Sequence, residues 1–283
     1  MNIDAHQHFW VYNEREYGWI GPQMGVLKRD YLPEELRPLQ EAAGIGGTVA
    51  VQARQTVAET RWLLALADQH PFIRGVVGWV DLRSPALRAD LEGLAHPKLR
   101  GVRHVIHDEA DDRFMLRPDF VRGLGLLAEF GLTYDLLLRY RHLPLAVELV
   151  ARYPRQRFVL DHIGKPPFQD GGLEPWATDL RRLAAYPNVC CKLSGLASEV
   201  DWTRWKATDF APYLDVVLEA YGPSRLMIGS DWPVCTLGAG YGETMGIVTD
   251  YIARLAPAER EAILGGTATR FYGLDSLSTR RPW

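Results

Sequence analysis

Residues 2–9 read NIDAHQHF, and this stretch guides the interpretation of the rest of the chain. Apolar and polar residues alternate along it, as they do in a strand with one buried face. In an extended strand, the side chains of Asp4, His6 and His8 project to the same side, and His8 stands at the carboxyl end. We therefore predict a first strand that presents two histidines and an aspartate together.

Seven further apolar, β-branched runs follow, separated by segments with helical periodicity. Strands that alternate with helices are typical of βαβ units and of a parallel sheet. The eight predicted strands are NIDAHQHF (2–9), GGTVAVQA (46–53), IRGVVGWVD (73–81), LRGVRHVIH (99–107), LTYDLLL (132–138), RFVLDHIG (157–164), VCCKLSG (189–195) and RLMIGSDWP (225–233). Eight such units favour an α/β fold closed into a single (β/α)8 TIM barrel over an open sheet.

Composition limits the classes of protein that remain. The 283 residues are 47% hydrophobic and 24% charged, which suits one barrel domain over 1–283. A net charge of −3 argues against nucleic acid or a membrane surface as partner. There is no signal-like N-terminal segment and no run of 18 apolar residues, so we expect a cytoplasmic protein. Three cysteines, two of them adjacent, disfavour disulfides and suit a reducing compartment. The sequence is compatible with a homo-oligomer.

Two connections, 10–45 and 164–188, are longer than a minimal loop. Long ordered loops in compact domains are often functional lids, although both also suit an extended surface loop. The last residues, 276–283 (SLSTRRPW), are polar apart from their ends, and we expect them to be poorly ordered.

Two further strand ends carry candidate catalytic residues. Asp231 ends the eighth predicted strand in GSDWP, where its carboxylate faces the barrel mouth; an aspartate that caps the following helix is the alternative. His162 closes the sixth strand beside Asp161, and strand alternation sends these two side chains to opposite faces. We choose His162 as the inward residue, and a different register would exchange the two roles.

Three imidazoles and one carboxylate at the barrel mouth allow two chemistries. His6, His8, His162 and Asp231 could hold one divalent ion such as zinc, which lowers the pKa of its bound water. They could also act without metal. In that case Asp231 is the general base for water, and the histidines donate hydrogen bonds to a carbonyl oxygen as it becomes negative.

Further polar residues stand near other predicted strand ends. Arg103 and His107 share a face of the fourth strand, while His104 points the other way. The predicted substrate-binding residues are Arg103, His107, Gln52, Trp79 and Tyr140. Arg54 and Asp81 are placed like Gln52 and Trp79 at the ends of the second and third strands, and Arg141 and Lys192 are, like Tyr140, weaker candidates. Polar groups beside an aromatic wall suit a polyhydroxylated ring. A surface position or an internal salt bridge is the alternative for Arg103 and His107.

The runs DAHQHFW, GVRHVIHDE, FMLRPDF, GLTYDLL, FVLDHIGKP, CKLSGL, LMIGSDWPV and TATRFYGL together resemble the amidohydrolase-related sugar lactonases, in particular the L-fuconolactonase and L-rhamnonolactonase group. The resemblance spans nearly the entire chain. It implies a (β/α)8 barrel that hydrolyses aldonolactones, with catalytic roles for His6, His8, His162 and Asp231. Relatives work without metal or with one zinc ion, so the resemblance implies no cofactor or a single divalent metal.

The sequence departs from the two-metal members of that superfamily. Lys98 precedes the fourth strand, so no lysine stands where a carboxylated bridging ligand would lie, and the fifth strand, LTYDLLL, has no histidine. We therefore do not expect a two-metal centre.

The sequence is compatible with three functions. The first is a carboxylic ester hydrolase that opens a sugar lactone, which we favour. The second is a metal-dependent decarboxylase or hydratase of the same superfamily. The third is a barrel without activity that binds a sugar acid. The choice among individual lactones depends on loop geometry, which one sequence does not determine.

Overall fold

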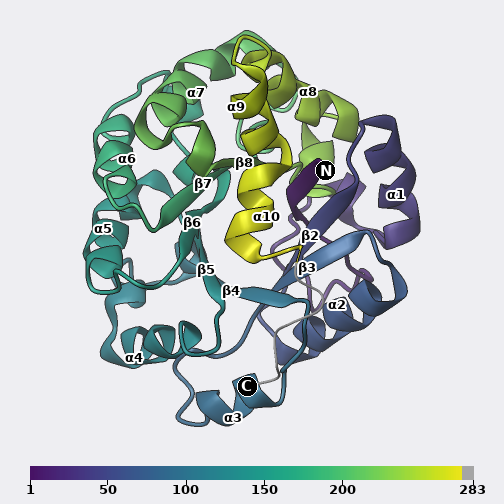
Figure 1. The fold of residues 1–283 in the computed structure, drawn as a ribbon. Coiled ribbons are helices and arrows are strands. Elements are labelled where there is room, and N and C mark those ends of the chain that lie inside the picture. Colours follow the sequence, from purple (N-terminus) through teal and green to yellow (C-terminus); the bar gives the residue numbers. More distant parts are fainter. Residues whose placement is uncertain (276–283) are drawn as a thin grey trace.

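All eight predicted strands are present, and they form one parallel sheet in sequence order (Figure 1). This computed structural model describes residues 1–275, so the predicted disorder of 276–283 concerns residues outside the described part. The strands are β1 Ile3–Gln7, β2 Gly47–Val51, β3 Ile73–Gly78, β4 Leu99–Val105, β5 Thr133–Leu137, β6 Phe158–Leu160, β7 Val189–Leu193 and β8 Leu226–Ile228. The prediction of a (β/α)8 barrel is confirmed.

Backbone hydrogen bonds between the ends of β1 and β8 close the barrel. The amide of Asp231 donates to the carbonyl of His6 at 2.8 Å, and the amide of His8 donates to the carbonyl of Trp232 at 2.6 Å. A parallel bridge joins Gln7 to Trp232. Three predicted site residues, His6, His8 and Asp231, therefore lie close together in space where the barrel closes.

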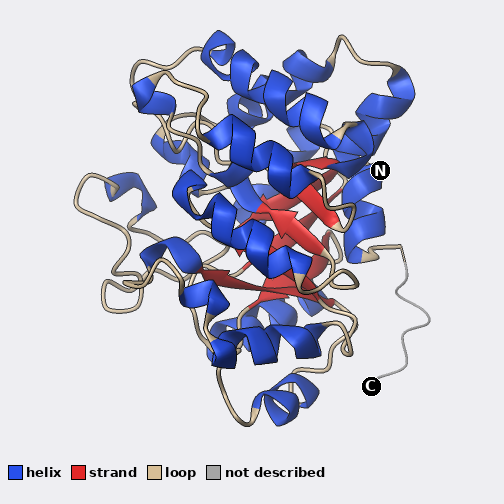
Figure 2. Ribbon diagram, turned by 90° about the vertical axis from the view of Figure 1, so that its left-hand side faces the viewer, coloured by secondary structure: helices blue, strands red, loops and turns tan. Residues whose placement is uncertain are grey.

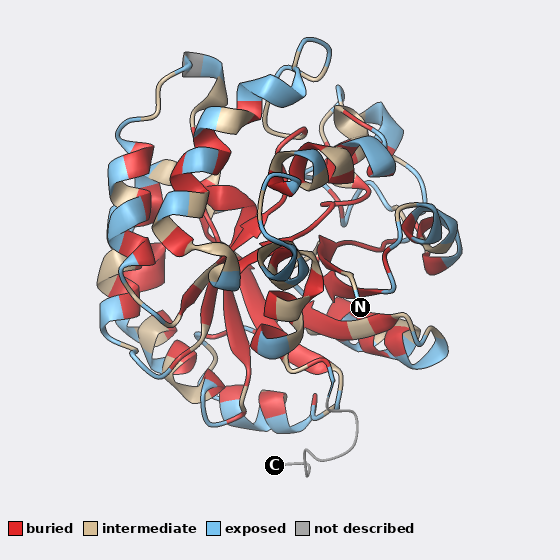
Figure 3. Cartoon of the chain, turned by 45° about the horizontal axis from the view of Figure 1, so that its top comes forward, coloured by how far each residue is buried: buried red, intermediate tan, exposed pale blue. Residues whose placement is uncertain are grey.

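Helices surround the ring of strands on the outside (Figure 2). Each connection between successive strands contains one α-helix, and the buried residues of α6 (Trp176, Leu180 and Leu183) recur at helical spacing. Figure 3 shows these buried faces turned towards the strands. The helices are α1 Pro33–Ala42, α2 Val57–Gln69, α3 Leu87–Glu92, α4 Pro118–Leu127, α5 Leu143–Ala151, α6 Trp176–Ala184, α7 Ala207–Tyr221, α8 Tyr241–Ile252, α9 Pro257–Glu261 and α10 Thr267–Tyr272.

Helix α10 covers the amino-terminal end of the barrel, and it lies across the centre of Figure 1. Its Phe271 and Tyr272 pack with Ile3, Val49 and other inward residues in an apolar cluster. Burial of this cluster stabilises the barrel from below. Because α10 covers the amino-terminal end, a functional site is expected at the opposite, carboxyl-terminal end of the barrel.

The first strand departs from the predicted alternation. Between Asp4 and Gln7 the register with β2 shifts, as at a β-bulge, so that Ala5 joins the apolar cluster inside the barrel while His6 also faces inward. The carboxylate of Asp4 instead accepts from Tyr241 of α8, at 3.1 Å. The prediction that Asp4 shares a face with His6 and His8 is therefore wrong, because the bulge changes the alternation.

Strands β6 and β8 end several residues earlier than predicted. His162, Ile163, Lys165 and Asp231 all have positive φ, between 46° and 57°. Left-handed backbone is unfavourable for residues with a Cβ and is concentrated at functional sites. Close approach of β1 adds a constraint, since a Cβ on Gly229 would stand 2.7 Å from the Cβ of His6.

The three cysteines, Cys190, Cys191 and Cys235, are free thiols, in agreement with the expectation of no disulfide. Within residues 1–275, no helix has the length and apolar character that crossing a bilayer requires.

Glycine packing in α4 gives a test of this fold. A Cβ on Gly123 would stand 1.8 Å from the carbonyl oxygen of Leu82. We expect G123A to lower the free energy of unfolding by about 1–3 kcal/mol, because the helix must shift. The matched variant is G246A in α8, where a Cβ meets open space. It should be neutral or stabilising by about 0.5–1 kcal/mol, since alanine favours a helix. Urea titration of both variants checks this, and equal stabilities would contradict the packing described.

Candidate active site

A cavity of about 330 Å³ opens at the carboxyl-terminal end of the barrel. His8, His162 and Asp231 lie in its wall, and Arg103 and His107 line it as well. Larger hollows exist on the outer surface, such as one of about 650 Å³ beside Lys206. Only the barrel cavity, among those described, receives the candidate catalytic side chains, so it is the site considered below.

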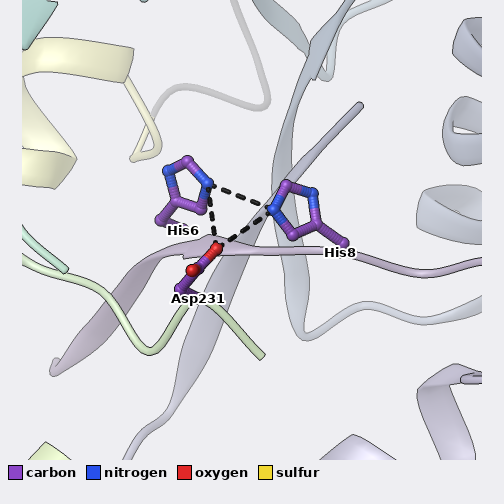
Figure 4. Close-up of side chains that lie close together, drawn as sticks. All are labelled: His6, His8 and Asp231. Carbon is purple, nitrogen blue, oxygen red and sulfur yellow. Dashed lines mark hydrogen bonds and ion pairs between the residues drawn. The ribbon is translucent and has the colours of Figure 1, made fainter. Parts of the chain in front are cut away.

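His6, His8 and Asp231 converge at the base of this site (Figure 4). Asp231 Oδ1 lies 3.3 Å from His8 Nε2 and 3.7 Å from His6 Nε2, and the two imidazole nitrogens are 3.3 Å apart. All three residues are at most 4% exposed. The two ends of the barrel seam therefore bring together residues more than 220 positions apart in the sequence.

His162 completes the group, with its Nε2 3.9 Å from Asp231 Oδ1. Asp161 also faces inward, 3.5 Å from His6 Nδ1. The prediction that only one of these neighbours looks into the barrel is therefore wrong. Strand β6 ends at Leu160, and the left-handed backbone at His162 turns its side chain to the same interior that Asp161 occupies.

Contacts at the ring nitrogens of His8 and His6 constrain their protons. His8 Nδ1 is 2.8 Å from the carbonyl oxygen of Val51, which can only accept, so Nδ1 carries a proton and donates it to that oxygen. His6 Nδ1 is 3.1 Å from Lys192 Nζ, and an ammonium group can only donate. Arg103 Nη1, which also can only donate, lies 3.2 Å from His6 Nε2, so both ring nitrogens of His6 face a cationic donor.

A buried cluster of charges surrounds His6. Lys192 Nζ lies 2.6 Å from Asp135 Oδ2 and 3.0 Å from Asp161 Oδ1, while Arg103 Nη1 lies 3.1 Å from Asp161 Oδ2 and 3.2 Å from His6 Nε2. Two cations are thus matched by two carboxylates in the barrel interior. Pairing of this kind is what permits buried charge.

The surroundings shift the pKa values of the central groups. Burial alone would raise the pKa of Asp231, but the nearby imidazole of His162 and the hydrogen bond from His8 outweigh it and lower that pKa below the usual range. Burial lowers the pKa of His162 to about 4. Burial and then Lys192 lower the pKa of His6 well below its usual value. At neutral pH the site therefore holds an ionised Asp231 beside neutral His6 and His162.

The donor set fits one divalent ion. Ligand atoms of His6, His8 and Asp231 lie within 4.8 Å of one another, and three-residue nitrogen and oxygen sets with an open position are typical of catalytic zinc. The hydrogen bond from His8 Nδ1 to Val51 orients its Nε2 as a ligand would require. His6 can ligate through Nε2 when its proton lies on Nδ1, where Asp161 Oδ1 can accept it.

The structure places three of the predicted substrate-binding residues at or directly behind the cavity. Arg103 and His107 line it together with Val105, as their shared strand face predicted. Burial, followed by the charge of Lys165, lowers the pKa of His107 to about 2, so its imidazole is neutral. Gln52 is fully buried, and its Oε1 accepts from Arg103 Nη2 at 2.9 Å, so it orients the guanidinium.

The remaining predicted residues are brought elsewhere. Trp79 donates its indole N–H to His104 Nδ1 at 3.2 Å, on the outer side of β4, because His104 points away from the barrel as predicted. Tyr140 packs against the apolar core in a 3₁₀ turn after β5. The other candidates also have partners of their own. Asp81 accepts from the Arg83 amide, Arg54 pairs with Glu16, Arg141 pairs with Asp112, and Lys192 belongs to the buried charge cluster.

Several cavity residues are absent from the sequence predictions. Ser198 Oγ lies 3.2 Å from Asp231 Oδ2, and Lys165, Glu199 and Arg139 line the rim. Trp19 and Met24 belong to the long 10–45 connection, and Lys165 begins the 164–188 connection, so both segments reach the site as long functional loops would. Ser198 and Glu199 follow the seventh strand closely, and that position was the available signal.

The comparisons with known proteins agree with this site. An L-fucono-1,5-lactonase of Burkholderia multivorans is 47% identical over 292 residues, covering 99% of both chains. An L-fucono-1,5-lactonase of Burkholderia ambifaria is 39% identical and covers 98% of this chain and 97% of its own. A crystal structure of an amidohydrolase from B. multivorans with bound zinc superimposes with a TM-score of 0.93 at 47% identity, covering 96% of this chain and 99% of that one.

The resemblance found in the sequence is thereby confirmed at the level of the family. Residues 3–274, which include every element from β1 to α10, match the family model described as Amidohydrolase. The chain belongs to the amidohydrolase family.

Proposed function

We propose that this chain is a lactonase that hydrolyses a sugar lactone, with L-fucono-1,5-lactone as the first candidate substrate. The observation that carries the proposal is the ionised Asp231 at the base of the cavity, surrounded by three imidazoles. The names and the 47% and 39% identities of the two full-length relatives support the choice of substrate.

The mixture of apolar and polar residues that line the cavity supports a deoxy sugar lactone as the substrate. Met24, Val234 and Leu237 give the lining apolar surface that suits a methyl group, whereas Lys165 and Glu199 give it polar groups that suit hydroxyl groups. Sites for small molecules combine apolar walls with a few placed polar groups in this way.

Asp231 acts as the general base. It takes one proton from a water molecule as the water oxygen bonds to the lactone carbonyl carbon. The ring C–O bond then breaks, and the departing alkoxide recovers the proton from Asp231, which leaves the open hydroxy acid. A carboxylate with a low pKa is a weak base, but an activated ester needs less assistance than an amide.

The negative carbonyl oxygen needs hydrogen-bond donors during this step. Ser194 Oγ is 2.9 Å from His162 Nδ1, and in this proposal it donates there, which leaves the His162 proton on Nε2 facing the cavity. Arg103 supplies a second, permanently charged donor at the same end of the barrel. Each such donor typically contributes a few kcal/mol to the transition state.

A divalent ion such as zinc, when bound, would supply a Lewis acid and a bound water of lowered pKa. His6, His8 and Asp231 would hold it, with His162 close by. We propose that the reaction does not require it, because the cationic Arg103 and Lys192 already lie at both nitrogens of His6.

Replacement of the base tests the function. We expect D231N to lower kcat for L-fucono-1,5-lactone by about 100-fold to 10,000-fold, because the amide cannot take a proton. The control is D250N on the exposed face of α8. Acid release followed with a pH indicator measures both variants. Full activity of D231N would eliminate the proposed base, and no lactone opening by the unaltered protein would eliminate the proposed function.

Metal removal tests the cofactor. After exhaustive chelation and dialysis, with residual zinc measured by mass spectrometry, we expect kcat to stay within about threefold of the untreated protein, because donors on His162 and Arg103 remain in place. Activity that disappears with the metal and returns with zinc would contradict this expectation and would make His6, His8 and Asp231 ligands.

A further inference from the structure

The polar rim of the cavity contains an ion pair that the mechanism above does not use. Lys165 Nζ lies 2.6 Å from Glu199 Oε1, and the two side chains are 13% and 20% exposed. We call it the Lys165–Glu199 pair. Its members follow neighbouring strands, β6 and β7, and both line the cavity that contains Asp231.

Lys165 reaches this cavity from a backbone conformation that is energetically unfavourable. Its φ of 46° is left-handed, in a turn where His162 and Ile163 also have positive φ. Such a conformation costs a lysine about 1 kcal/mol or more, whereas glycine or asparagine would adopt it more easily. The turn places Lys165 on the rim three residues after His162, so one strained segment supplies both a catalytic candidate and the rim cation.

Structural stabilisation alone is a weak explanation for the pair. An ion pair near solvent contributes about 0–1 kcal/mol, which the left-handed backbone of Lys165 offsets. Glu199 has a second cation nearby, since Arg139 Nη1 lies 3.9 Å from its Oε2. Oε1 of Glu199 is therefore paired closely with Lys165, whereas Oε2 has only the more distant Arg139.

The chemistry of the pair matches a hydroxyl group. Each ring hydroxyl of a sugar lactone both donates and accepts one or more hydrogen bonds. Lys165 offers N–H donors and Glu199 offers an acceptor oxygen, side by side on one wall. A hydroxyl on the correct face of the ring can bond to both groups, whereas its epimer forms neither hydrogen bond. Loss of hydrogen bonds to charged groups in a site produces discrimination between substrates.

We propose that the Lys165–Glu199 pair recognises a ring hydroxyl of the lactone and is a specificity determinant of this site. This inference rests on the proposed lactonase function. The pair lies beside the reacting centre and takes no proton from the attacking water. Its loss therefore changes which epimer is preferred more than it changes the chemistry.

The test uses three pairs of 6-deoxyaldono-1,5-lactones, epimeric at C2, C3 or C4, with kcat and KM measured for the unaltered protein, K165M and E199Q. The matched control is E219Q, which breaks an outer ion pair of 3.0 Å between Glu219 and Arg181. We expect the unaltered protein to discriminate within at least one pair. Both rim variants should bring that kcat/KM ratio at least tenfold closer to one, chiefly through a higher KM for the preferred epimer, and E219Q should leave it unchanged.

The proposal would be overturned if the kcat/KM ratios of K165M and E199Q stayed within twofold of the unaltered protein for all three epimer pairs. It would also be overturned if the unaltered protein opened all epimers equally. If E199Q fails to fold by circular dichroism, E199D reads the same ratio, because it keeps the charge but withdraws the carboxylate from the rim. An unaltered protein that opens none of the lactones would instead overturn the lactonase function itself. The two failures are therefore distinguishable.

Discussion

The buried charge cluster around His6 is the interaction on which the site depends. Lys192, Asp135 and Asp161 are fully buried and Arg103 is 3% exposed, all inside the barrel. Charges removed from water cost several kcal/mol each unless they are paired with good geometry, so these four groups must keep their positions. His6 contacts Lys192 through one ring nitrogen and Arg103 through the other, which fixes the orientation of its ring.

The same cluster connects the two ends of the barrel. The hydroxyl of Tyr272, in α10, donates to Asp135 Oδ2 at 2.8 Å, and Asp135 in turn accepts from Lys192. The helix that closes the amino-terminal end therefore supports the group that orients His6 at the other. Burial raises the pKa of Asp135 to about 6, so its ionised form depends on Lys192 remaining beside it. The packing of α10 at one end of the barrel therefore contributes to the position of His6 at the other end.

Most of the fold followed from periodicity, whereas the exact interior required backbone detail. Alternation of apolar residues located all eight strands, and the HxH and GSDWP runs located His6, His8 and Asp231. Alternation failed where the backbone is irregular. The bulge in β1 moved Asp4 behind the barrel wall, and the left-handed turn after Leu160 brought His162 inward beside Asp161. The bulge in β1 has no glycine or proline signal, and the turn after Leu160 has Gly164 and Pro166, which mark a turn but do not indicate that His162 itself is left-handed.

The rim was harder to predict than the base for a related reason. Trp79 and Tyr140 stand near strand ends, yet their side chains pack away from the cavity, while Lys165 and Glu199 reach it from loops. Loop side chains follow no period, so a single sequence does not indicate which of them face inward. The catalytic candidates His6, His8 and Asp231 lie on or just after strands, where a sequence pattern exists. Lys165 and Glu199, which we assign to substrate recognition, lie on loops without such a pattern.

Hydrolysis of L-fucono-1,5-lactone in water enriched in ¹⁸O, with the product acid quenched early and analysed by mass spectrometry, tests the central claim most directly. An Asp231-activated water that attacks the carbonyl carbon predicts one ¹⁸O atom in the carboxyl group of the product and none in its ring-derived hydroxyl. Label in that hydroxyl, or lactone consumption no faster than in buffer alone, would contradict the account.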